Sequence, residues 1–323
     1  MAPTTSVDID PRYAAHDTGT GHPERPERIA AFCNRARLPS PRRADRVWRM
    51  VAAAGAARDD AHVVLRNVRM AFEDREVLRG LSCAFPRGKI SVILGGSGSG
   101  KTTILRLLGG LVRPQGGEVS VAGHDISQLS ETEMYTVRQK LGMMFQGGAL
   151  LDSLTIFDNL AFPLREHTRL REPEIADEVH LQLAAVGLTG VDALLPGQLS
   201  GGMIKRAALA RAIITKPEIL LCDEPFSGLD PISVKRIEAL LRRINRQLQI
   251  TMLVSSHHIP STMRMADQVL LLLDGVPVAG PPHELRKSPD PRIAGFLSEE
   301  ADESFDAAEA AGPQAAVPHA VAP

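Results

Sequence analysis

The sequence predicts an α/β fold, and three observations support this prediction. Apolar runs typical of strands alternate with segments of helical periodicity between residues 62 and 297. A glycine-rich loop joins one of these runs to a helical segment, and another run ends on two adjacent acidic residues. Because ligands of open α/β folds bind at the carboxyl ends of the strands, we expect the loop and the acidic pair to share one site.

Composition narrows the class of protein. The chain has 323 residues, enough for one large core with appendages or for two modest domains. Aromatic residues make up only 4% of the chain and the net charge is -1, which argues against a nucleic-acid-binding surface. The three cysteines, Cys33, Cys83 and Cys222, are widely spaced and favour reduced thiols in a cytosolic protein.

No targeting segment is evident in the sequence. The first ten residues lack the basic start and apolar core of a signal peptide. The longest tight aliphatic run, residues 269–273, is far too short to cross a bilayer. We therefore expect a cytoplasmic chain, unless a partner carries it to a membrane.

The two ends of the chain differ from its centre. Residues 1–61 are rich in Arg, Pro and Ala, and eight Arg face only three acidic residues between positions 23 and 49. A flexible arm, with a short helix near residues 47–57, is the preferred interpretation, and a second folded domain is the alternative. Residues 298–323 hold six acidic residues and no Lys or Arg, which predicts a disordered, solvated tail.

One stretch of the arm, residues 16–29, resembles the opening segment of histone-deacetylase-like hydrolases. The zinc ligands that those enzymes carry further along the chain have no counterpart in this sequence. A zinc deacetylase is therefore the least favoured function.

Strands are expected at residues 62–68, 89–95, 118–123, 142–146, 218–223, 251–256 and 269–274. The run at 89–95 is almost continuously apolar, as in a parallel sheet that is buried on both faces. Between residues 155 and 195 helical periodicity replaces the strand pattern, most clearly at 173–188. This change predicts a helical subdomain, at about residues 150–215, inserted into the α/β core.

The glycine-rich loop fits the pattern GxxxxGK followed by Ser or Thr, between a predicted strand and a predicted helix. Its glycines let several backbone N–H groups point at phosphate oxygens, and the following helix adds its positive end. We expect Lys101 to bind the β and γ phosphates and the Thr102 hydroxyl to coordinate Mg²⁺. The alternative is a glycine turn with a chance lysine. The predicted nucleotide-binding residues here are Gly95, Gly96, Ser97, Gly98, Ser99, Gly100, Lys101, Thr102 and Thr103.

The acidic pair is Asp223 and Glu224, at the end of the apolar run 219–222. Asp223 is expected to orient Mg²⁺ through a water, and Glu224 to take a proton from the attacking water. An acidic pair by itself is more often a helix cap, so the catalytic interpretation depends on its pairing with the phosphate loop.

The stretch LSGGM, residues 199–203, contains no acid, base or strong nucleophile. It precedes a helical run, which places Ser200, Gly201 and Gly202 at a helix N-terminus suited to an anion. One chain already has a phosphate loop, so a second anion site is redundant within it. In a head-to-tail pair, each chain's LSGG could close over the γ-phosphate held by the other.

With these motifs in this order, residues 62–297 resemble the ATP-binding subunits of ABC transporters, which are P-loop NTPases. The resemblance implies that Phe72 stacks on adenine, Gln146 senses Mg²⁺ and the membrane partner, Asp230 lies at a dimer interface, and His257 contacts the γ-phosphate. Glu224, His257 and Gln146 are then the catalytic set, and Thr102, Gln146 and Asp223 the Mg²⁺ set. An alternative for Phe72 is a core or hairpin residue.

Two positions depart from the family pattern. Met203 stands where most members have Gln, and His258 stands where Asp commonly follows the histidine. Neither change removes a group that is assigned to catalysis. The adjacent His257 and His258 could suggest a metal site, but neighbours in sequence rarely converge on one ion.

Residues 134–168 and the LSGGM stretch further resemble the ATPase subunit of Mla-type phospholipid transporters. This resemblance implies an ATPase homodimer on the cytoplasmic face of the inner membrane, two permease subunits, a ring of MCE-domain lipid-binding proteins and often a STAS-domain subunit. In this family the segment at residues 146–168 receives a cytoplasmic helix of the permease. A glycerophospholipid is the first choice of substrate, and a sterol or another hydrophobic compound is the next.

Two other functions remain open at this point. One is the ATPase of an importer for a different substrate, such as an amino acid. The other is a soluble ABC-type ATPase of translation or DNA repair. Such proteins tend to carry two cassettes or a long coiled coil, whereas this chain has one cassette and no sustained heptads.

Overall fold

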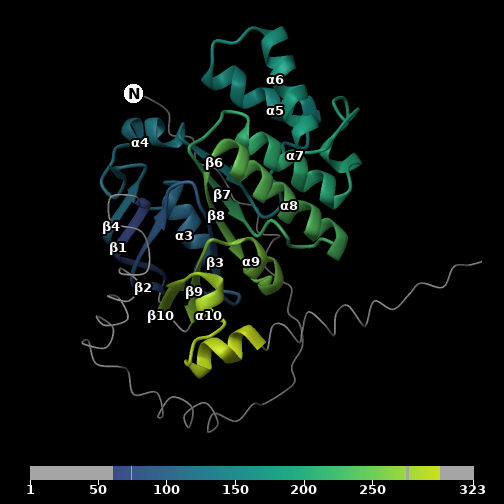
Figure 1. Ribbon diagram of the computed structural model, residues 1–323. Coiled ribbons are helices and arrows are strands. Elements are labelled where there is room, and N and C mark those ends of the chain that lie inside the picture. The colour runs from purple at the N-terminus through teal and green to yellow at the C-terminus, as the bar shows by residue number, and fades with distance from the viewer. Residues whose placement is uncertain (1–60, 74, 274–275, 299–323) are drawn as a thin grey trace, which may run out of the picture. The chain divides into compact units, whose positions relative to one another are not determined.

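The computed structural model describes residues 61–73, 75–273 and 276–298, which form two sheets and the helices that pack on them (Figure 1). The predicted arm, its helix near 47–57 and the stretch 16–29 lie outside the described residues, apart from Ala61. The acidic tail beyond Ser298 also lies outside them. The predicted domain boundaries therefore stay predictions.

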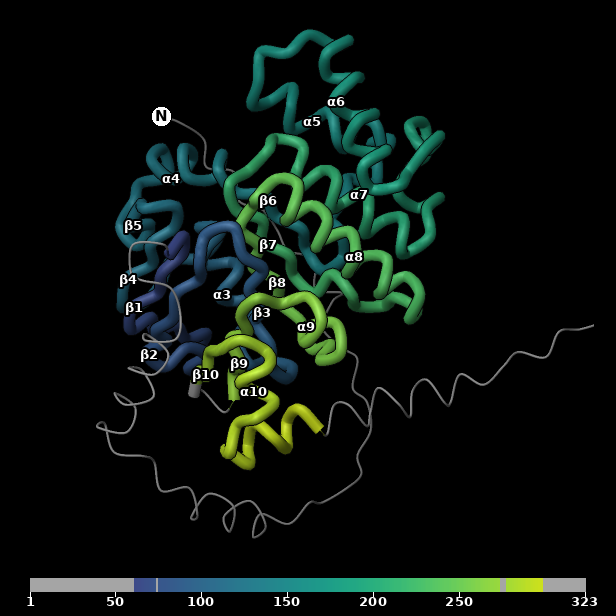
Figure 2. The backbone as a smooth tube through the Cα atoms, in the orientation of Figure 1, coloured from purple at the N-terminus to yellow at the C-terminus, as the bar shows by residue number. Residues whose placement is uncertain are grey.

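The larger sheet has six strands in the order β10-β9-β3-β8-β7-β6. All neighbouring pairs are parallel except β9 with β10. Figure 2 shows β3, β8, β7 and β6 running side by side, and each begins within one residue of the start predicted for it. The strands are β3 (Ile90–Leu94), β6 (Leu141–Met144), β7 (Ile219–Asp223), β8 (Thr251–Ser256), β9 (Gln268–Leu273) and β10 (Val276–Gly280).

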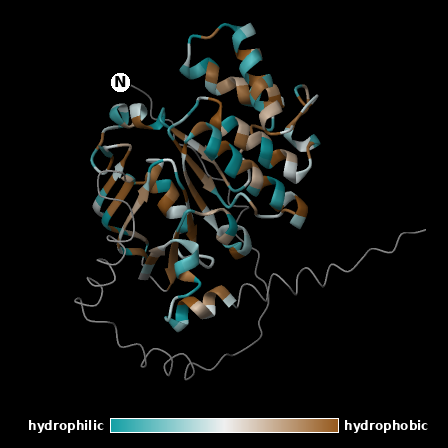
Figure 3. Ribbon diagram, in the orientation of Figure 1, coloured by the Kyte–Doolittle hydropathy of each residue, from teal (hydrophilic) through white to brown (hydrophobic). Residues whose placement is uncertain are grey.

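Both faces of this sheet are buried. Because successive side chains of a strand point to opposite faces, Ile93, Leu221 and Leu253 join one apolar cluster, whereas Val92, Leu220 and Met252 join another. Figure 3 shows hydrophobic residues gathered along these central strands. The near-continuous apolar runs of the sequence therefore have the physical cause that was expected for them.

The smaller sheet is antiparallel, with four strands in the order β2-β1-β4-β5. The sequence predicted parts of β1 and β4 but missed β2, β5 and β10. In β2 the buried side chains are Leu78, Leu81, Cys83 and Phe85, and the alternation shifts phase beside Gly80, whose φ is 82°. The strands are β1 (Ala61–Phe72), β2 (Arg75–Pro86), β4 (Gly116–Val121) and β5 (His124–Asp125).

The helix that follows the glycine loop, α3 (Lys101–Leu108), lies between the two sheets. It contacts β7 and β8 of the larger sheet and β4 of the smaller one. Its buried side chains, Ile104, Leu105, Leu107 and Leu108, belong to the apolar cluster that both sheets share. The start of α3 is therefore held at the carboxyl edge of β3.

On the other face of the larger sheet, one apolar cluster joins sheet residues to residues of four helices: α5 (Ile156–His167), α6 (Glu172–Ala185), α7 (Gly201–Ile213) and α8 (Pro231–Leu248). Helices α5, α6 and α7 pack on one another, and residues 155–195 contain no strand, as predicted. The remaining helices are α4 (Glu131–Arg138), the short 3-10 turn η3 (Pro196–Gln198), α9 (Ile259–Met265), α10 (Pro282–Leu285) and a helix at residues 291–298. No helix within the described ranges combines the length and apolar character needed to cross a membrane.

Helix α7 approaches the sheet very closely at Gly142 of β6. A Cβ atom at this position would lie 2.1 Å from the backbone oxygen of Ala212 and 2.9 Å from Cγ of Pro217. Only a residue without a side chain permits this contact. Gly142 therefore sets the distance between α7 and the sheet.

We expect Gly142→Ala to destabilise the fold, because backbone has to move away from the added methyl group. The free energy of unfolding should fall by about 1–3 kcal/mol, the usual cost of overpacking, and thermal denaturation measures the change. Gly197→Ala is the matched control, since a Cβ there meets no atom within 4 Å. Equal melting temperatures for the two variants would contradict the close approach.

Candidate functional site

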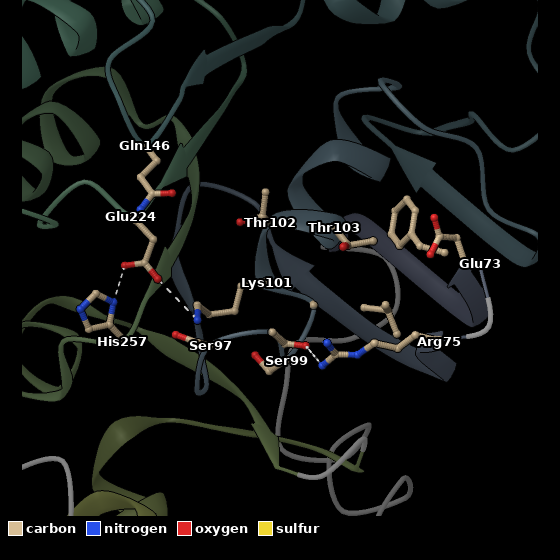
Figure 4. Close-up of a pocket in the computed structure, with 14 residues that line it drawn as sticks. Glu73, Arg75, Ser97, Ser99, Lys101, Thr102, Thr103, Gln146, Glu224 and His257 are labelled. Carbon is tan, nitrogen blue, oxygen red and sulfur yellow. Dashed lines mark hydrogen bonds and ion pairs between the residues drawn. The ribbon is translucent and has the colours of Figure 1, made fainter. Parts of the chain in front are cut away.

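A cavity of about 620 Å³ opens at the carboxyl edge of the larger sheet (Figure 4). Five segments contribute to its wall: the β1–β2 hairpin, the glycine loop with the start of α3, and the segments that follow β6, β7 and β8. The lining residues are Phe72, Glu73, Arg75, Val77, Ser97, Gly98, Ser99, Gly100, Lys101, Thr102, Thr103, Gln146, Glu224 and His257. The fold therefore brings most of the predicted site residues together.

The glycine loop, residues 95–100, wraps around the ammonium group of Lys101. Nζ of Lys101 donates to the backbone oxygen of Gly95 at 2.6 Å and to that of Gly96 at 3.1 Å. Gly98 and Gly100 have φ values of 75° and 100°, a region that favours glycine. Gly100 is the N-cap of α3 and makes no side-chain cap, so the first amides of this helix are available to a phosphate group.

Asp223 is buried at the end of β7 and accepts two hydroxyl hydrogen bonds. Its Oδ1 atom lies 3.0 Å from Oγ1 of Thr102 and 2.6 Å from Oγ of Ser255. Asp223 and Ser255 are register partners in the parallel pair of β7 and β8, which explains the shorter contact. The Thr102 contact joins the glycine loop to the neighbouring strand end.

Glu224 follows directly, and its backbone turns into the left-handed region with a φ of 46°. A non-glycine residue in this region carries a conformational cost of about 1–2 kcal/mol, so its surroundings must hold it there. On one side, the amide of Glu224 donates to Oγ of Ser255 at 2.9 Å. The turn directs the carboxylate away from β7 and into the cavity, where Figure 4 shows it between His257 and Lys101.

Glu224 is 7% exposed, and its carboxylate contacts the side chains of His257 and Lys101. Oε2 lies 2.9 Å from Nδ1 of His257, and Oε1 lies 3.5 Å from Nζ of Lys101. Burial would raise the pKa of Glu224, but the hydrogen bond and charge of His257, together with Lys101, lower this pKa below its usual value. Glu224 is therefore ionised near neutral pH and able to accept a proton.

The β1–β2 hairpin closes the far end of the cavity. Phe72, at the end of β1, is 43% exposed and lines the cavity, as expected of an aromatic residue that meets a base. Nη2 of Arg75 donates to the backbone oxygen of Gly98 at 3.3 Å. Glu73, Arg75 and Val77 were not predicted, because the sequence analysis did not identify the β1–β2 hairpin. The sequence signal for these three residues is the short turn after Phe72. Phe72 pairs with Arg75 across this turn, so the hairpin brings the residues after it to the cavity.

The remaining predicted residues lie outside this cavity's wall, around two helix N-termini. Ser200 caps α7 and accepts from the Met203 amide at 3.3 Å, so Gly201 and Gly202 form the first turn, as predicted. Asp230 caps α8 and accepts from the amides of Ile232 and Ser233. A Cβ at Gly202 would lie 3.3 Å from Oγ of Ser233, so the two helix ends are neighbours.

The two departures from the family pattern have structural roles. The side chain of Met203 is partly buried and packs against the apolar cluster beneath α7 and α8. Nδ1 of His258 accepts from the Ser261 amide at 3.2 Å and caps α9, a role that suits Asp. His257 faces Glu224 whereas His258 caps its own helix, so these neighbours do not converge on one ion.

A glycine loop before a helix, with a carboxylate pair on a nearby parallel strand, defines a P-loop nucleoside triphosphatase. The capped α7 after LSGG places it in the ABC class. Residues 78–227 match the family model described as ABC transporter. The chain is 44% identical over 241 residues to the intermembrane phospholipid transport system ATP-binding protein MlaF of Escherichia coli K12. The aligned residues are 74% of this chain and 90% of MlaF. The chain therefore belongs to the ATP-binding proteins of ABC transporters and is an ATPase.

Two further comparisons agree with this assignment. The probable ribonucleotide transport ATP-binding protein mkl of Mycobacterium tuberculosis H37Rv is 40% identical over 260 residues, which are 77% of this chain and 72% of that protein. Among solved structures, the ATP-binding cassette MJ0796, in a dimeric post-hydrolysis state bound to ADP and phosphate, has a TM-score of 0.63 and 30% identity. The match covers 68% of this chain and 98% of that one. The fold class predicted from the sequence is confirmed.

Proposed function

We propose that this chain powers an inner-membrane ABC transporter that moves phospholipid between membranes, with residues 62–297 as its ATPase domain. The observation that carries this proposal is the 44% identity to MlaF across 90% of that protein. The ATP site described above supplies the chemistry. Association with permease subunits would place the chain on the cytoplasmic face of the membrane.

In the proposed site, the glycine loop and the first turn of α3 bind the phosphates of ATP. The amides of residues 96–103 and the ammonium of Lys101 face the β and γ phosphates, and Phe72 packs against the adenine. In the structure Lys101 already donates to two loop carbonyls. Its charge is therefore positioned by the loop itself.

The polar side chains around Thr102 suit a magnesium ion, which prefers oxygen ligands and takes few of them from the protein. The Thr102 hydroxyl lies 3.0 Å from the Asp223 carboxylate, and the amide side chain of Gln146 lines the same cavity. We infer that Thr102 and Gln146 would hold the ion and that Asp223 would orient it. Bound there, Mg²⁺ would neutralise charge on the β and γ phosphates.

Glu224 is the proposed general base. Its carboxylate is buried, ionised and hydrogen-bonded to His257, so it can accept a proton from a water that attacks the γ-phosphorus. His257, which contacts Glu224 in the cavity wall, would meet the γ-phosphate itself. The pair would thus align the attacking water and the phosphate.

We expect Glu224→Gln to bind ATP and to lose turnover. The amide keeps the size of the side chain but cannot take up a proton, and a positioned base contributes about 10²–10⁴-fold to rate. Steady-state phosphate release and ATP affinity together measure the effect. Glu218→Gln, on an exposed carboxylate at the opposite end of β7, is the control. Turnover within a few-fold of wild type would remove Glu224 from this role.

The proposal includes an ATPase homodimer in which Ser200, Gly201 and Gly202 serve the partner's nucleotide. Two observations support this arrangement. The capped N-terminus of α7 lies outside the wall of its own ATP cavity, and the similar cassette MJ0796 has a dimeric structure. Asp230, at the adjacent N-terminus of α8, and Ile232, 65% exposed, would lie at the interface.

A mixed dimer tests this composite site. A Ser200→Arg subunit paired with a Lys101→Ala subunit should keep one intact site, because both lesions then fall in the other one. Each variant as a homodimer should keep none. Trapped ATP per dimer, measured in a Glu224→Gln background, should be one for the isolated mixed dimer. No trapped nucleotide would show that LSGG serves its own subunit.

A second cavity, of about 510 Å³, is the proposed docking site for a permease helix. It lies between α4, β6, α5 and α7, and its wall includes Pro163, His167 and Thr168 from the segment predicted to contact the permease. Tyr135, which is 48% exposed, and Arg211 also line this cavity. Arg211 also donates to the backbone oxygens of Gly148 and Ala149, two and three residues beyond Gln146. The docking site thus adjoins the ATP site.

The partners decide the substrate. We expect two permease subunits and an MCE-domain protein to co-purify with the chain from detergent-solubilised membranes. A STAS-domain subunit should co-purify as well. Mass spectrometry of the complex identifies them, and a Tyr135→Asp variant, altered in the docking cavity, is the control. Recovery of an amino-acid-binding protein in place of the MCE protein would replace the phospholipid proposal.

A further inference from the structure

Lys205 is a buried cation on α7 that neither the sequence motifs nor the ATP cavity account for. Its residue is 6% exposed and does not line the cavity. Burying an ammonium group is costly unless its hydrogen bonds are satisfied. The ammonium group donates to two backbone carbonyls and one hydroxyl. Lys205 therefore mainly binds the main chain of other segments.

The three acceptors belong to the segments that carry Gln146 and Glu224. Nζ of Lys205 donates to the backbone oxygen of Gln146, to that of Glu224 at 3.3 Å, and to Oγ of Ser227 at 3.3 Å. These segments follow β6 and β7, whereas Lys205 lies five residues after the Ser200 cap. One side chain therefore connects α7, the helix that begins in the LSGG stretch, to the two segments that carry Gln146 and Glu224.

On the Glu224 side, the contact restrains a strained backbone. Glu224 has a φ of 46°, and its amide is held by Ser255. Its carbonyl oxygen accepts from Lys205 and, at 2.9 Å, from the hydroxyl of Ser227. The two peptide groups that flank the Glu224 side chain are thus fixed from opposite sides, and with them the direction of the carboxylate.

On the Gln146 side, α7 holds three carbonyls of a short loop with two cations. Lys205 binds the oxygen of Gln146, and Arg211 binds those of Gly148 and Ala149. Gly148 has a φ of 83°, and a Cβ there would lie 3.0 Å from Cγ2 of Ile204. The loop after β6 therefore packs closely against α7, with contacts at Gln146, Gly148 and Ala149.

We propose that Lys205 is a positioning residue for ATP hydrolysis, which sets the backbones of Gln146 and Glu224 relative to the LSGG helix. The inference rests on the proposed roles of Gln146 and Glu224. Through this contact, the helix whose N-terminus serves the partner's nucleotide also holds the base of its own site. Misplacement of a reacting group by about 1 Å can cost up to 10²-fold in rate, so a single restraint of this kind matters.

The test is a series of variants in the full-length chain. Lys205→Met keeps the apolar stem and removes the ammonium group. It should lower kcat roughly 10- to 100-fold and leave ATP affinity within about threefold, because no residue of the cavity wall is changed. Lys205→Arg, which retains charge and donors, should recover most of the loss. Lys216→Met, three residues beyond the end of the same helix, removes an exposed ammonium group that pairs with half-buried Glu178; it is the control and should behave as wild type.

A double variant separates positioning from general stability. In the Glu224→Gln background, Lys205→Met should lower the residual turnover by less than it lowers turnover in the wild-type background, because Glu224, one of the two residues that it positions, is already inactive. A full further loss there would overturn the inference. So would turnover of Lys205→Met within twofold of wild type, or parallel losses of kcat, ATP affinity and melting temperature that Lys205→Arg does not relieve.

The outcomes distinguish this inference from the proposed function. If Glu224→Gln is inactive while Lys205→Met is normal, only the role of Lys205 fails. If Glu224→Gln itself stays active, the catalytic assignment fails first. Should Lys205→Met not fold, Lys205→Gln, which keeps an uncharged donor, is measured by the same three readouts, and it should lie between Met and Arg.

Discussion

The burial of the parallel sheet on both faces is the constraint on which the site depends. Apolar residues of β3, β7 and β8 share one apolar cluster with α3 on one side and another with α7 and α8 on the other. This packing fixes the three strands next to each other, with their carboxyl ends at one edge. The glycine loop follows β3, the acidic pair follows β7, and His257 follows β8. Residues more than a hundred positions apart thus meet, and contacts such as that of Thr102 with Asp223 then form between them.

Within this frame, buried charges compensate one another. Lys101, Asp223, Glu224 and Lys205 are all less than 10% exposed. Alone, each would be costly to bury, but Lys101 faces Glu224, hydroxyl groups donate to Asp223, and carbonyl oxygens surround Lys205. The network is polar throughout yet closely satisfied, which lets it hold an ionised base and a strained backbone in one geometry.

Helix ends provide the second recurring device. Helix α3 leaves its first amides without a side-chain cap at the ATP cavity, whereas Ser200, Asp230 and His258 cap α7, α8 and α9. The uncapped end is the one proposed to meet phosphate in its own subunit. The capped ends of α7 and α8 lie together, where the proposed partner would supply its nucleotide. In the proposed dimer, one chain would thus hold two helix ends that face phosphate, one for its own nucleotide and one for the partner's.

Local patterns in the sequence determined much of this protein. The apolar runs located the strands of the parallel sheet. The glycine loop, LSGG and the acidic pair each consist of a few adjacent residues, so their chemistry can be inferred from the sequence alone. Tertiary structure decided the rest. Strand β2 was missed because its alternation shifts at Gly80, and Arg75 and Val77 of the cavity wall were missed with it. Lys205 gave no signal because two of its three acceptors are main-chain carbonyls 19 and 59 residues away, and any residue type can supply a carbonyl oxygen. The sequence gives the chemistry of each side chain directly. The positions of backbone carbonyls relative to distant side chains are set only when the chain folds and packs.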